Sequence, residues 1–193
     1  MRYPVQVYLG QICDYPGSHP SAIDKRLVDG EVMLTPLGLE GDQQAEAARG
    51  IHGGIDRALC HYPREHYQRW ARDFPLLAEH FTAPAFGENL STEGLDEHNV
   101  NIGDIFRWGK TLIQVTQPRS PCYKLNFHFD IDDISQLMQD TVRTGWLYRT
   151  IPGGGVSADA PLERVSRVSD VSVYEAGAIA WHFLLTMSNT SAC

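Results

Sequence analysis

The segment 117–124, QPRSPCYK, surrounds one cysteine with residues that change what a thiol can do. Cys122 follows a proline, with Arg119 three residues before it and Lys124 two residues after it. The two cations would favour the thiolate, and the two prolines would stiffen the loop. Such a thiolate can act as a nucleophile or bind a soft metal, whereas a lone cysteine is often an inert buried residue. The residues alone leave these three interpretations open.

The segment 51–62, IHGGIDRALCHY, is a second candidate because it combines glycines with hydrogen-bond donors. Gly53 and the glycine after it would let the backbone approach a ligand closely, and successive amides can form an anion nest. His52 and Arg57 would add side-chain donors, and Asp56 could orient Arg57. The alternative interpretation is an ordinary loop in which the glycines only supply turns.

The segment 86–90, FGENL, is a third candidate. Gly87 is followed by a carboxylate and an amide, Glu88 and Asn89, which accept and donate hydrogen bonds in fixed directions. These groups could hold the polar edge of a heterocyclic ring, or the flanking apolar residues could simply pack around them. Taken alone, the segment does not decide between binding and packing.

Several common catalytic motifs are absent from the sequence. It contains no GxxxxGK[ST], no GxGxxG after an expected strand, no HExxH and no GxSxG. These absences argue against a P-loop nucleotidase, a Rossmann dehydrogenase, an HExxH zinc protease and an α/β-hydrolase. The glycines at 153–155 are predicted to form a flexible turn and not a phosphate cradle.

The elements that must position these residues begin with short strands. Residues 5–12 alternate with a period of about two, which places Val5, Val7 and Leu9 on one face. A short apolar strand is predicted at 58–60, directly after the glycine-containing segment. The glycine-containing segment is therefore expected to be a loop that enters a strand.

A hairpin is predicted to carry the chain to the candidate cysteine. Residues 104–117 contain two strand-like runs, and Gly109 with Lys110 suits a two-residue turn of type II′. The second run leads directly to Cys122. Residues 30–43 are predicted to be a further strand that breaks into a glycine-rich loop.

Three helices are predicted. Residues 63–74 form the clearest one, because a proline suits the first turn and apolar residues recur on one side. That apolar stripe consists of Tyr67, Trp70, Ala71 and Phe74. A shorter helix is predicted at 133–142 with Asp133 as its N-cap, and a third opens at Ser172, three residues before Glu175 as in a capping box.

Composition and charge set limits on the class of protein. The 193 residues carry a formal charge of −8, with 42% hydrophobic and 21% charged residues, as in ordinary soluble domains. The acidic balance argues against a general nucleic-acid binder, and no apolar run approaches the ~20 residues of a membrane span. The N-terminus lacks the pattern of a signal peptide, so the cytoplasm is expected, with four unpaired cysteines. Many short strands, a few short helices and 17 glycines predict a mainly β protein, a β-barrel with helical insertions.

Five segments in order along the chain resemble the MOSC domain, named for the C-terminal domain of molybdenum cofactor sulfurase. They are LTPLGLEGDQ, HGGIDRALCHYPREHYQRW, PAFGENLSTEGL, NIGDIFRWGKTLIQVTQPRSPCYKL and VSADAPLERVSRVSDV. The resemblance extends from the N-terminus to His182 and is close to one bacterial branch of the family. It implies a mostly antiparallel β-barrel, which agrees with the pattern of strands.

The resemblance also implies a molybdenum cofactor site, in which a pterin dithiolene holds molybdenum and a protein cysteine supplies a further sulfur. Cys122 matches that cysteine, and it is therefore expected to be the metal ligand and the catalytic residue. The pterin phosphate would account for guanidinium groups in an acidic protein. The motifs expected to bind the cofactor contain His52, Gly53, Asp56, Arg57, Gly87, Glu88, Asn89, Arg119 and Ser120.

The activity implied by the resemblance is reduction of N-hydroxylated compounds, such as 6-N-hydroxylaminopurine, to amines, which would detoxify base analogues. The cofactor would carry the redox chemistry, and the electrons would come from an external donor, expected to be a flavoprotein reductase. No nucleic-acid or membrane partner is expected, and a homodimer is considered as the assembly. Two alternatives are a carrier of molybdenum cofactor or sulfur that uses Cys122, and a cysteine hydrolase that uses Cys122 and His52.

The resemblance predicts two regions, a MOSC β-barrel domain at 1–168 and an incomplete helical segment at 169–193. Members of the bacterial branch continue into a small three-helix appendage, and this sequence resembles its first helix before it departs. No element is predicted after His182. The departure puts in question the stability of the appendage, the docking of the electron donor and the assembly.

Overall fold

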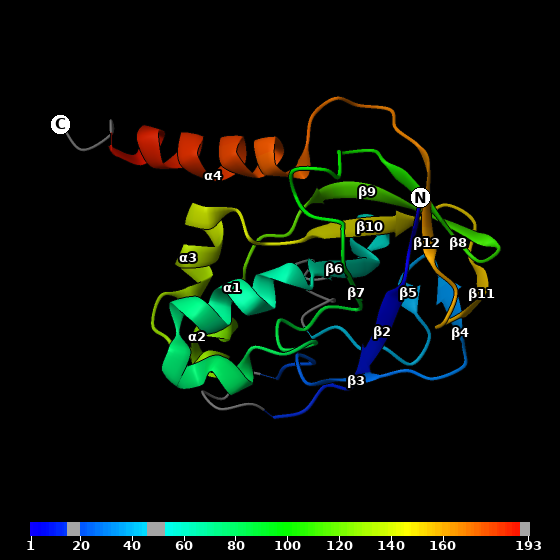
Figure 1. Cartoon of the computed structure of the whole chain (residues 1–193), viewed down its shortest axis with the longest axis horizontal. Coiled ribbons are helices and arrows are strands. Elements are labelled where there is room, and N and C mark those ends of the chain that lie inside the picture. The colour runs from blue at the N-terminus through cyan, green and yellow to red at the C-terminus, as the bar shows by residue number, and fades with distance from the viewer. Residues whose placement is uncertain (15–19, 46–52, 190–193) are drawn as a thin grey trace.

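The computed structural model describes residues 1–14, 20–45 and 53–189, with side chains as far as Trp181 (Figure 1). Within these ranges, nine strands form one sheet and three strands form a smaller one. The large sheet contains, in spatial order, β1 (Arg2–Tyr3), β12 (Leu162–Ser166), β8 (Ile105–Trp108), β9 (Thr111–Pro118), β10 (Trp146–Thr150), β6 (Leu59–Pro63), β7 (Leu90–Thr92), β2 (Val5–Gly10) and β3 (Lys25–Leu27). The small sheet contains β11 (Gly154–Ser157), β4 (Glu31–Thr35) and β5 (Gly38–Leu39).

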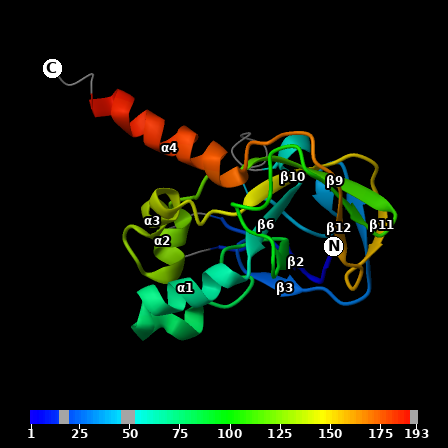
Figure 2. The ribbon, with the colours of Figure 1, turned by 45° about the horizontal axis from the view of Figure 1, so that its top comes forward.

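The large sheet curls into a half-barrel (Figure 2), and this confirms the predicted mainly β, barrel-type fold. Its neighbouring strands are antiparallel, except that β6 and β7 run parallel. Both sheets contribute to one hydrophobic core, with Val7 from β2, Trp108 from β8 and Leu34 from β4. This core holds the strand ends from which the candidate site is built.

The predicted strands and hairpin are confirmed, with one correction. Val5, Val7 and Leu9 all contact the barrel core, as the alternation predicts. β8 and β9 pair up to Trp108 and Thr111, with a two-residue turn between them in which Gly109 has a φ of 59°. The prediction of a flexible turn at 153–155 is wrong from residue 154 onward, because Gly154–Ser157 pairs with β4 as β11.

Short helices cover a second core at one side of the barrel (Figure 1). They are α1 (Glu65–Asp73), the 3₁₀ helix η3 (Pro75–His80), α2 (Lys124–Phe129) and α3 (Ile134–Thr141). Tyr67 and Trp70 of α1 are buried in this core, which confirms the predicted stripe, whereas α2 was not predicted. Asp133 precedes α3 as predicted, but within the described chain its side chain makes no capping hydrogen bond.

A longer helix, α4 (Val173–Asn189), follows the barrel. Its N-terminus is the predicted capping box, since the Glu175 amide donates to Ser172 Oγ at 3.1 Å and the Ser172 amide donates to Glu175 Oε2 at 2.8 Å. The sequence predicts no element after His182, but the helix continues to Asn189, so that expectation is wrong for these residues. In the described ranges, no helix has the length and apolar character needed to cross a membrane.

Candidate functional site

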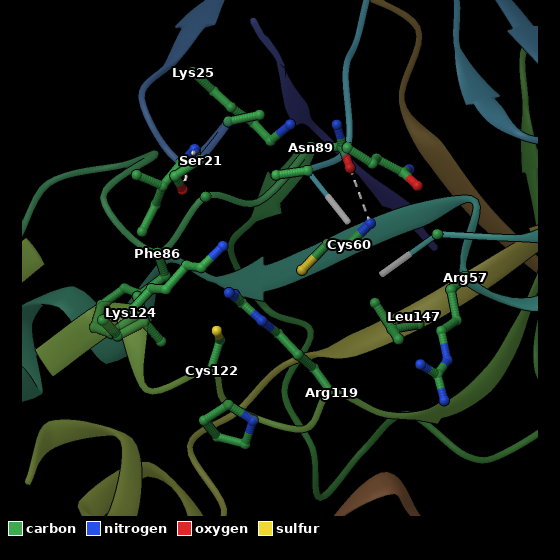
Figure 3. Close-up of a pocket in the computed structure, with 18 of the residues that line it drawn as sticks. Ser21, Lys25, Arg57, Cys60, Phe86, Asn89, Arg119, Cys122, Lys124 and Leu147 are labelled. Carbon is green, nitrogen blue, oxygen red and sulfur yellow. Dashed lines mark hydrogen bonds between the residues drawn. The ribbon is translucent and has the colours of Figure 1, made fainter. Parts of the chain in front are cut away.

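A cavity of about 600 Å³ opens beside the loop that follows β9 (Figure 3). Its lining residues lie within stretches that are far apart in sequence, at 21–25, 42–45, 53–60, 86–89, 117–125 and 147. Strand ends and loops on a rigid scaffold are common places for binding residues. The barrel therefore brings together the three segments that the sequence singles out as candidates.

Cys122 is placed by the end of a long strand and the start of a short helix. β9 ends at Pro118, and the Arg119 amide then donates to the Gly145 carbonyl at 3.1 Å beside the start of β10. The Cys122 carbonyl accepts from the Leu125 amide at 3.0 Å in the turn that opens α2. The thiol is partly buried and unpaired, and its sulfur points into the cavity (Figure 3).

Arg119 carries a partly buried positive charge into the cavity. Its Nη1 atom is buried and has no hydrogen-bond partner among the described residues. Burial acts against the charge, but the neighbouring Cys60 and Glu88 outweigh it and raise the pKa of Arg119 above its ordinary value. A buried donor without a partner costs free energy, so this nitrogen is a candidate contact for an anionic ligand.

A network of buried polar groups fixes one wall of the cavity. Lys25 forms a buried ion pair with Asp42, whose Oδ2 accepts from Asn89 Nδ2 at 2.8 Å. Asn89 Nδ2 also donates to the Tyr8 carbonyl at 3.2 Å, while Asn89 Oδ1 accepts from the Cys60 amide at 3.1 Å. Asn89 thus lines the cavity, but its amide hydrogens already serve to hold the wall in place.

Cys60 is a second thiol at the cavity. It lies on β6 between buried Leu59 and His61. Because side chains alternate along a strand, the Cys60 side chain points to the face of the strand opposite to theirs. Burial raises the pKa of the Cys60 thiol, although Arg119 opposes this effect. Figure 3 shows the sulfur atoms of Cys60 and Cys122 near Arg119, to which both are electrostatically coupled. The sequence predicts only an apolar strand at 58–60, and this interpretation does not single out Cys60.

Most of the predicted cofactor-binding residues do line this cavity. Together with Cys122 they are Gly53, Arg57, Gly87, Asn89, Arg119 and Ser120. Gly87 has a φ of 73°, and a Cβ atom there would stand 3.0 Å from the Ile23 side chain, so a glycine suits the position. Arg57 closes the short 3₁₀ helix η2 (Ile55–Arg57) at the rim. His52 lies outside the described residues.

Two predicted residues lie outside the described lining of the cavity. Asp56 is half exposed and pairs with Arg149, with Oδ1 2.9 Å from Nη2. Glu88 is fully buried behind the lining, where its Oε1 accepts from the Tyr67 hydroxyl at 2.5 Å. Burial raises the pKa of Glu88 to about 7, although the hydrogen bond from Tyr67 and the charge of Arg119 both oppose this shift.

Further lining residues were absent from the predicted site, namely Lys25, Asp42, Cys60 and Lys124. Lys124 is buried, and its Nζ donates to the Pro20 carbonyl at 2.9 Å. Asp42 and Lys124 belong to segments that carry the family resemblance, so their position offered a signal. Lys25 lies outside those segments, and only its pairing with Asp42 in the fold brings it to the cavity.

The arrangement limits how a metal could be held. Among the described residues, no group of three or more His, Cys, Asp or Glu side chains is placed to hold a metal ion. A metal at Cys122 would therefore have to bring most of its ligands with it, as a metal bound by an organic dithiolate does. The unpaired thiol, the partly buried guanidinium and the size of the cavity suit an anionic group with a soft metal centre.

Comparison with known proteins places this chain in a family. Residues 48–163 match the MOSC domain. The chain is 72% identical to protein YiiM of Escherichia coli (strain K12) over 182 residues, which are 94% of this chain and 80% of that protein. It is 36% identical to a protein of Gibberella moniliformis named Reductase over 141 residues, which are 72% of this chain and 25% of that protein.

Solved structures give the same result. The crystal structure of YiiM from Escherichia coli superposes with a TM-score of 0.80 at 65% identity, covering 94% of this chain and 78% of that one. The crystal structure of YiiM from Geobacillus stearothermophilus superposes with a TM-score of 0.75 at 30% identity, covering 98% of this chain and 91% of that one. The domain match, the sequence identity and the superposed structure agree, and the chain belongs to the MOSC-domain family.

Proposed function

We propose that this chain is a molybdenum cofactor-dependent reductase that converts N-hydroxylated compounds, such as 6-N-hydroxylaminopurine, to amines. The MOSC match and the relatives named YiiM and Reductase support an oxidoreductase. The name Reductase describes a protein of which the match covers only 25%, so it supports the class of reaction and not the substrate. The observation that carries the proposal is the orphaned Arg119 Nη1, without a partner among the described residues, in the cavity that holds the Cys122 thiol.

The residues at the cavity fit a molybdenum–pterin group. Cys122 would supply a soft thiolate to the metal, and Arg119 Nη1 would donate to an anionic part of the group. Arg57 at the rim is a second guanidinium of the lining. Phe86 and Leu147 provide apolar walls that exclude water, which strengthens these charge interactions.

The reaction defines what the protein must provide. Reduction of R–NHOH to R–NH₂ and water consumes two electrons and two protons as the N–O bond breaks. The bound cofactor would supply the two-electron chemistry, while the chain holds the substrate against it and delivers protons. We further propose that the electrons come from a separate flavoprotein reductase, since the sequence contains no recognisable flavin, haem or iron–sulfur motif.

The experiment compares molybdenum content and turnover among three forms of the full chain. Wild type, Cys122→Ser and Cys13→Ser are purified from cells supplied with molybdate, and Cys13 serves as the control because it is an exposed free thiol outside the described lining. We expect close to one molybdenum per chain in wild type and in the control, and little in Cys122→Ser. Hydroxylaminopurine reduction with reduced methyl viologen as donor should follow the metal content.

Three results would overturn the proposal. Folded wild type without molybdenum, pterin or turnover, produced in cofactor-competent cells, would remove its basis. A wild-type chain that carries an extra sulfur atom on Cys122, detected by mass spectrometry, and that shows no turnover would support the sulfur carrier instead. Metal-independent activity abolished by thiol alkylation would favour a cysteine hydrolase.

A further inference from the structure

Glu88 is a buried carboxyl group that cofactor binding does not explain. Its side chain is fully buried, and it stands behind the described lining of the cavity that holds Cys122. Oε1 accepts from the Tyr67 hydroxyl at 2.5 Å, whereas Oε2 is buried and has no hydrogen-bond partner within the described ranges. A carboxylate oxygen in this state is costly unless it carries a proton or exchanges one.

On one side, Glu88 is coupled to the cavity around Cys122. The charge of Glu88 raises the pKa of Arg119, and Arg119 in turn lowers the pKa of Glu88, against the larger effect of burial. Glu88 also acts on the Cys60 thiol, which lines that cavity. The unpartnered Oε2 of Glu88 and the unpartnered Nη1 of Arg119, judged over the described residues, therefore belong to one electrostatic unit.

On the other side, Glu88 is connected to a second cavity of about 510 Å³. Tyr67 and Tyr8 line this cavity together with Arg64 and Gln6. Tyr67 thus lines the second cavity and also donates its hydroxyl group to Glu88. Burial raises the pKa of Tyr8 to about 12, and the charge of Glu88 adds to this shift.

The surroundings of Glu88 let it exchange a proton near neutral pH. Burial raises its pKa to about 7, although Tyr67 and Arg119 lower it in part. Five titratable groups from four parts of the fold are coupled to Glu88: Tyr8 of β2, Cys60 and Tyr62 of β6, Tyr67 of α1, and Arg119 after β9.

We propose that Glu88 is a proton-relay residue that passes protons from the second cavity, through the Tyr67 hydroxyl, toward the cavity that holds Cys122 and Arg119. The inference rests on the proposed function, because reduction of an N–O bond consumes two protons for every two electrons from the external donor. In each transfer Glu88 releases a carboxyl proton from Oε2, and Tyr67 gives its hydroxyl proton to Oε1 while taking a proton from a hydronium ion that enters by the second cavity and leaves as water. Rotation of the carboxyl group then returns the proton from the Oε1 side to the Oε2 side, so both residues end in their starting state.

The first test is spectroscopic and does not require cofactor. Infrared difference spectra of the folded chain, recorded between pH 5 and pH 9, should show a buried carboxyl C=O band that titrates near pH 7 and is absent in Glu88→Gln. In Tyr67→Phe the titration should move to higher pH, because the hydrogen bond that favours the ionised form is lost. No carboxyl band that depends on Glu88 in this range would overturn the relay.

The second test uses the molybdenum-loaded protein. Glu88→Gln and Tyr67→Phe should lower kcat for hydroxylaminopurine reduction by about 10²-fold with KM and molybdenum content unchanged, and should lose the pH dependence near pH 7. Tyr62→Phe is the matched control, because it removes a buried hydroxyl that contacts Trp70 and Arg143 instead of Glu88. We expect it to keep the wild-type pH profile.

The outcomes separate the relay from the proposed function. An active wild type with an unchanged pH profile in Tyr67→Phe, which keeps the carboxyl group, would overturn the relay and leave Glu88 as a structural residue. A wild type that carries molybdenum but reduces no N-hydroxylated compound would overturn the proposed function, while the infrared titration would still report on Glu88.

Discussion

Two fully buried carboxyl groups, Glu97 and Glu88, are bonded to neighbouring residues of α1, yet their pKa values are shifted in opposite directions. Glu97 Oε2 lies 2.7 Å from His66 Nε2, and its Oε1 accepts from the amides of Thr144 at 3.0 Å and Gly145 at 2.7 Å. Burial acts against the charge of Glu97, but His66 and the backbone donors outweigh it and lower the pKa. For Glu88, burial dominates and raises the pKa to about 7.

The difference shows how hydrogen-bond satisfaction separates a scaffold residue from a chemically active one. Both oxygens of Glu97 are bonded, and through Gly145 this carboxylate holds the carbonyl that accepts from the Arg119 amide. Glu97 thereby helps to hold the Arg119 backbone in place without lining the described cavity. Glu88 has a single side-chain donor among the described residues, so hydrogen bonds stabilise its ionised form less than they stabilise that of Glu97.

The largest effect is expected from Glu97→Gln. The substitution keeps one acceptor oxygen but removes the buried charge that pairs with His66, and breaking such a buried pair costs about 3–5 kcal/mol of unfolding free energy. Urea unfolding at pH 7 measures this loss. Glu93→Gln is the control, because Glu93 is 69% exposed in its pair with Arg64. This substitution should lower the free energy of unfolding by well under about 1 kcal/mol. Equal losses in the two variants would contradict the scaffold role of Glu97.

Glu88 and Glu97 should make the free energy of unfolding depend on pH in opposite directions. The raised pKa of Glu88 means that the folded chain binds its proton more tightly, so this group stabilises the fold below about pH 4.3, and the stabilisation is lost as pH rises toward 7. The lowered pKa of Glu97 gives stability that is present above about pH 4.3 and is lost as pH falls. The free energy of unfolding of Glu88→Gln, measured relative to that of wild type, should therefore increase by roughly 3 kcal/mol between pH 4.5 and pH 8.

The measurement for Glu88 is a series of urea unfolding curves across that pH range. Wild type and Glu88→Gln should diverge above pH 5, with the difference levelling off above pH 7. If the stabilities of wild type and Glu88→Gln changed in parallel with pH, the raised pKa of Glu88 would be contradicted. Glu88 would then be a structural carboxylate like Glu97.

The smallest effect is expected from Asp56→Asn. Asp56 pairs with Arg149 at the surface, where the two side chains are 55% and 46% exposed, so its loss should change stability by less than about 0.5 kcal/mol. Molybdenum content should also stay at the wild-type value, since Asp56 lies outside the described lining. Elemental analysis checks this, and a clear loss of metal would return Asp56 to the site that the sequence predicts.

Local patterns in the sequence were sufficient for much of the fold and for the centre of the site. Alternation of apolar residues places Val5, Val7 and Leu9 in the core, and the Gly109 turn sets the hairpin that leads to Cys122. Arg119 and Cys122 are close because they share one short loop. These features depend on neighbours in sequence, and a single sequence contains that information.

The other side of the site depends on pairings that the sequence does not reveal. The parallel pairing of β6 with β7 brings the Asn89 side chain to the Cys60 amide. The sequence does not reveal this pairing, so it predicts a side-chain amide that is available for a ligand. Glu88 and Asn89 are adjacent, but one is directed to Tyr67 and the other to the cavity wall. Lys25 meets Asp42 only after β3 has joined β2. Such contacts follow from tertiary packing and not from local spacing.

The pairing of β1 with β12 has a consequence for biosynthesis. Arg2 pairs with Glu163 and Tyr3 with Leu162, so β1 finds its partner only after about 160 further residues have been translated. Closing so long a loop is entropically costly and is expected to slow folding. The cavity likewise needs residues from Ser21 to Leu147. A nascent chain on the ribosome thus lacks a complete cavity, and any ligand of the cavity can bind only after residues up to Leu147 have been synthesised.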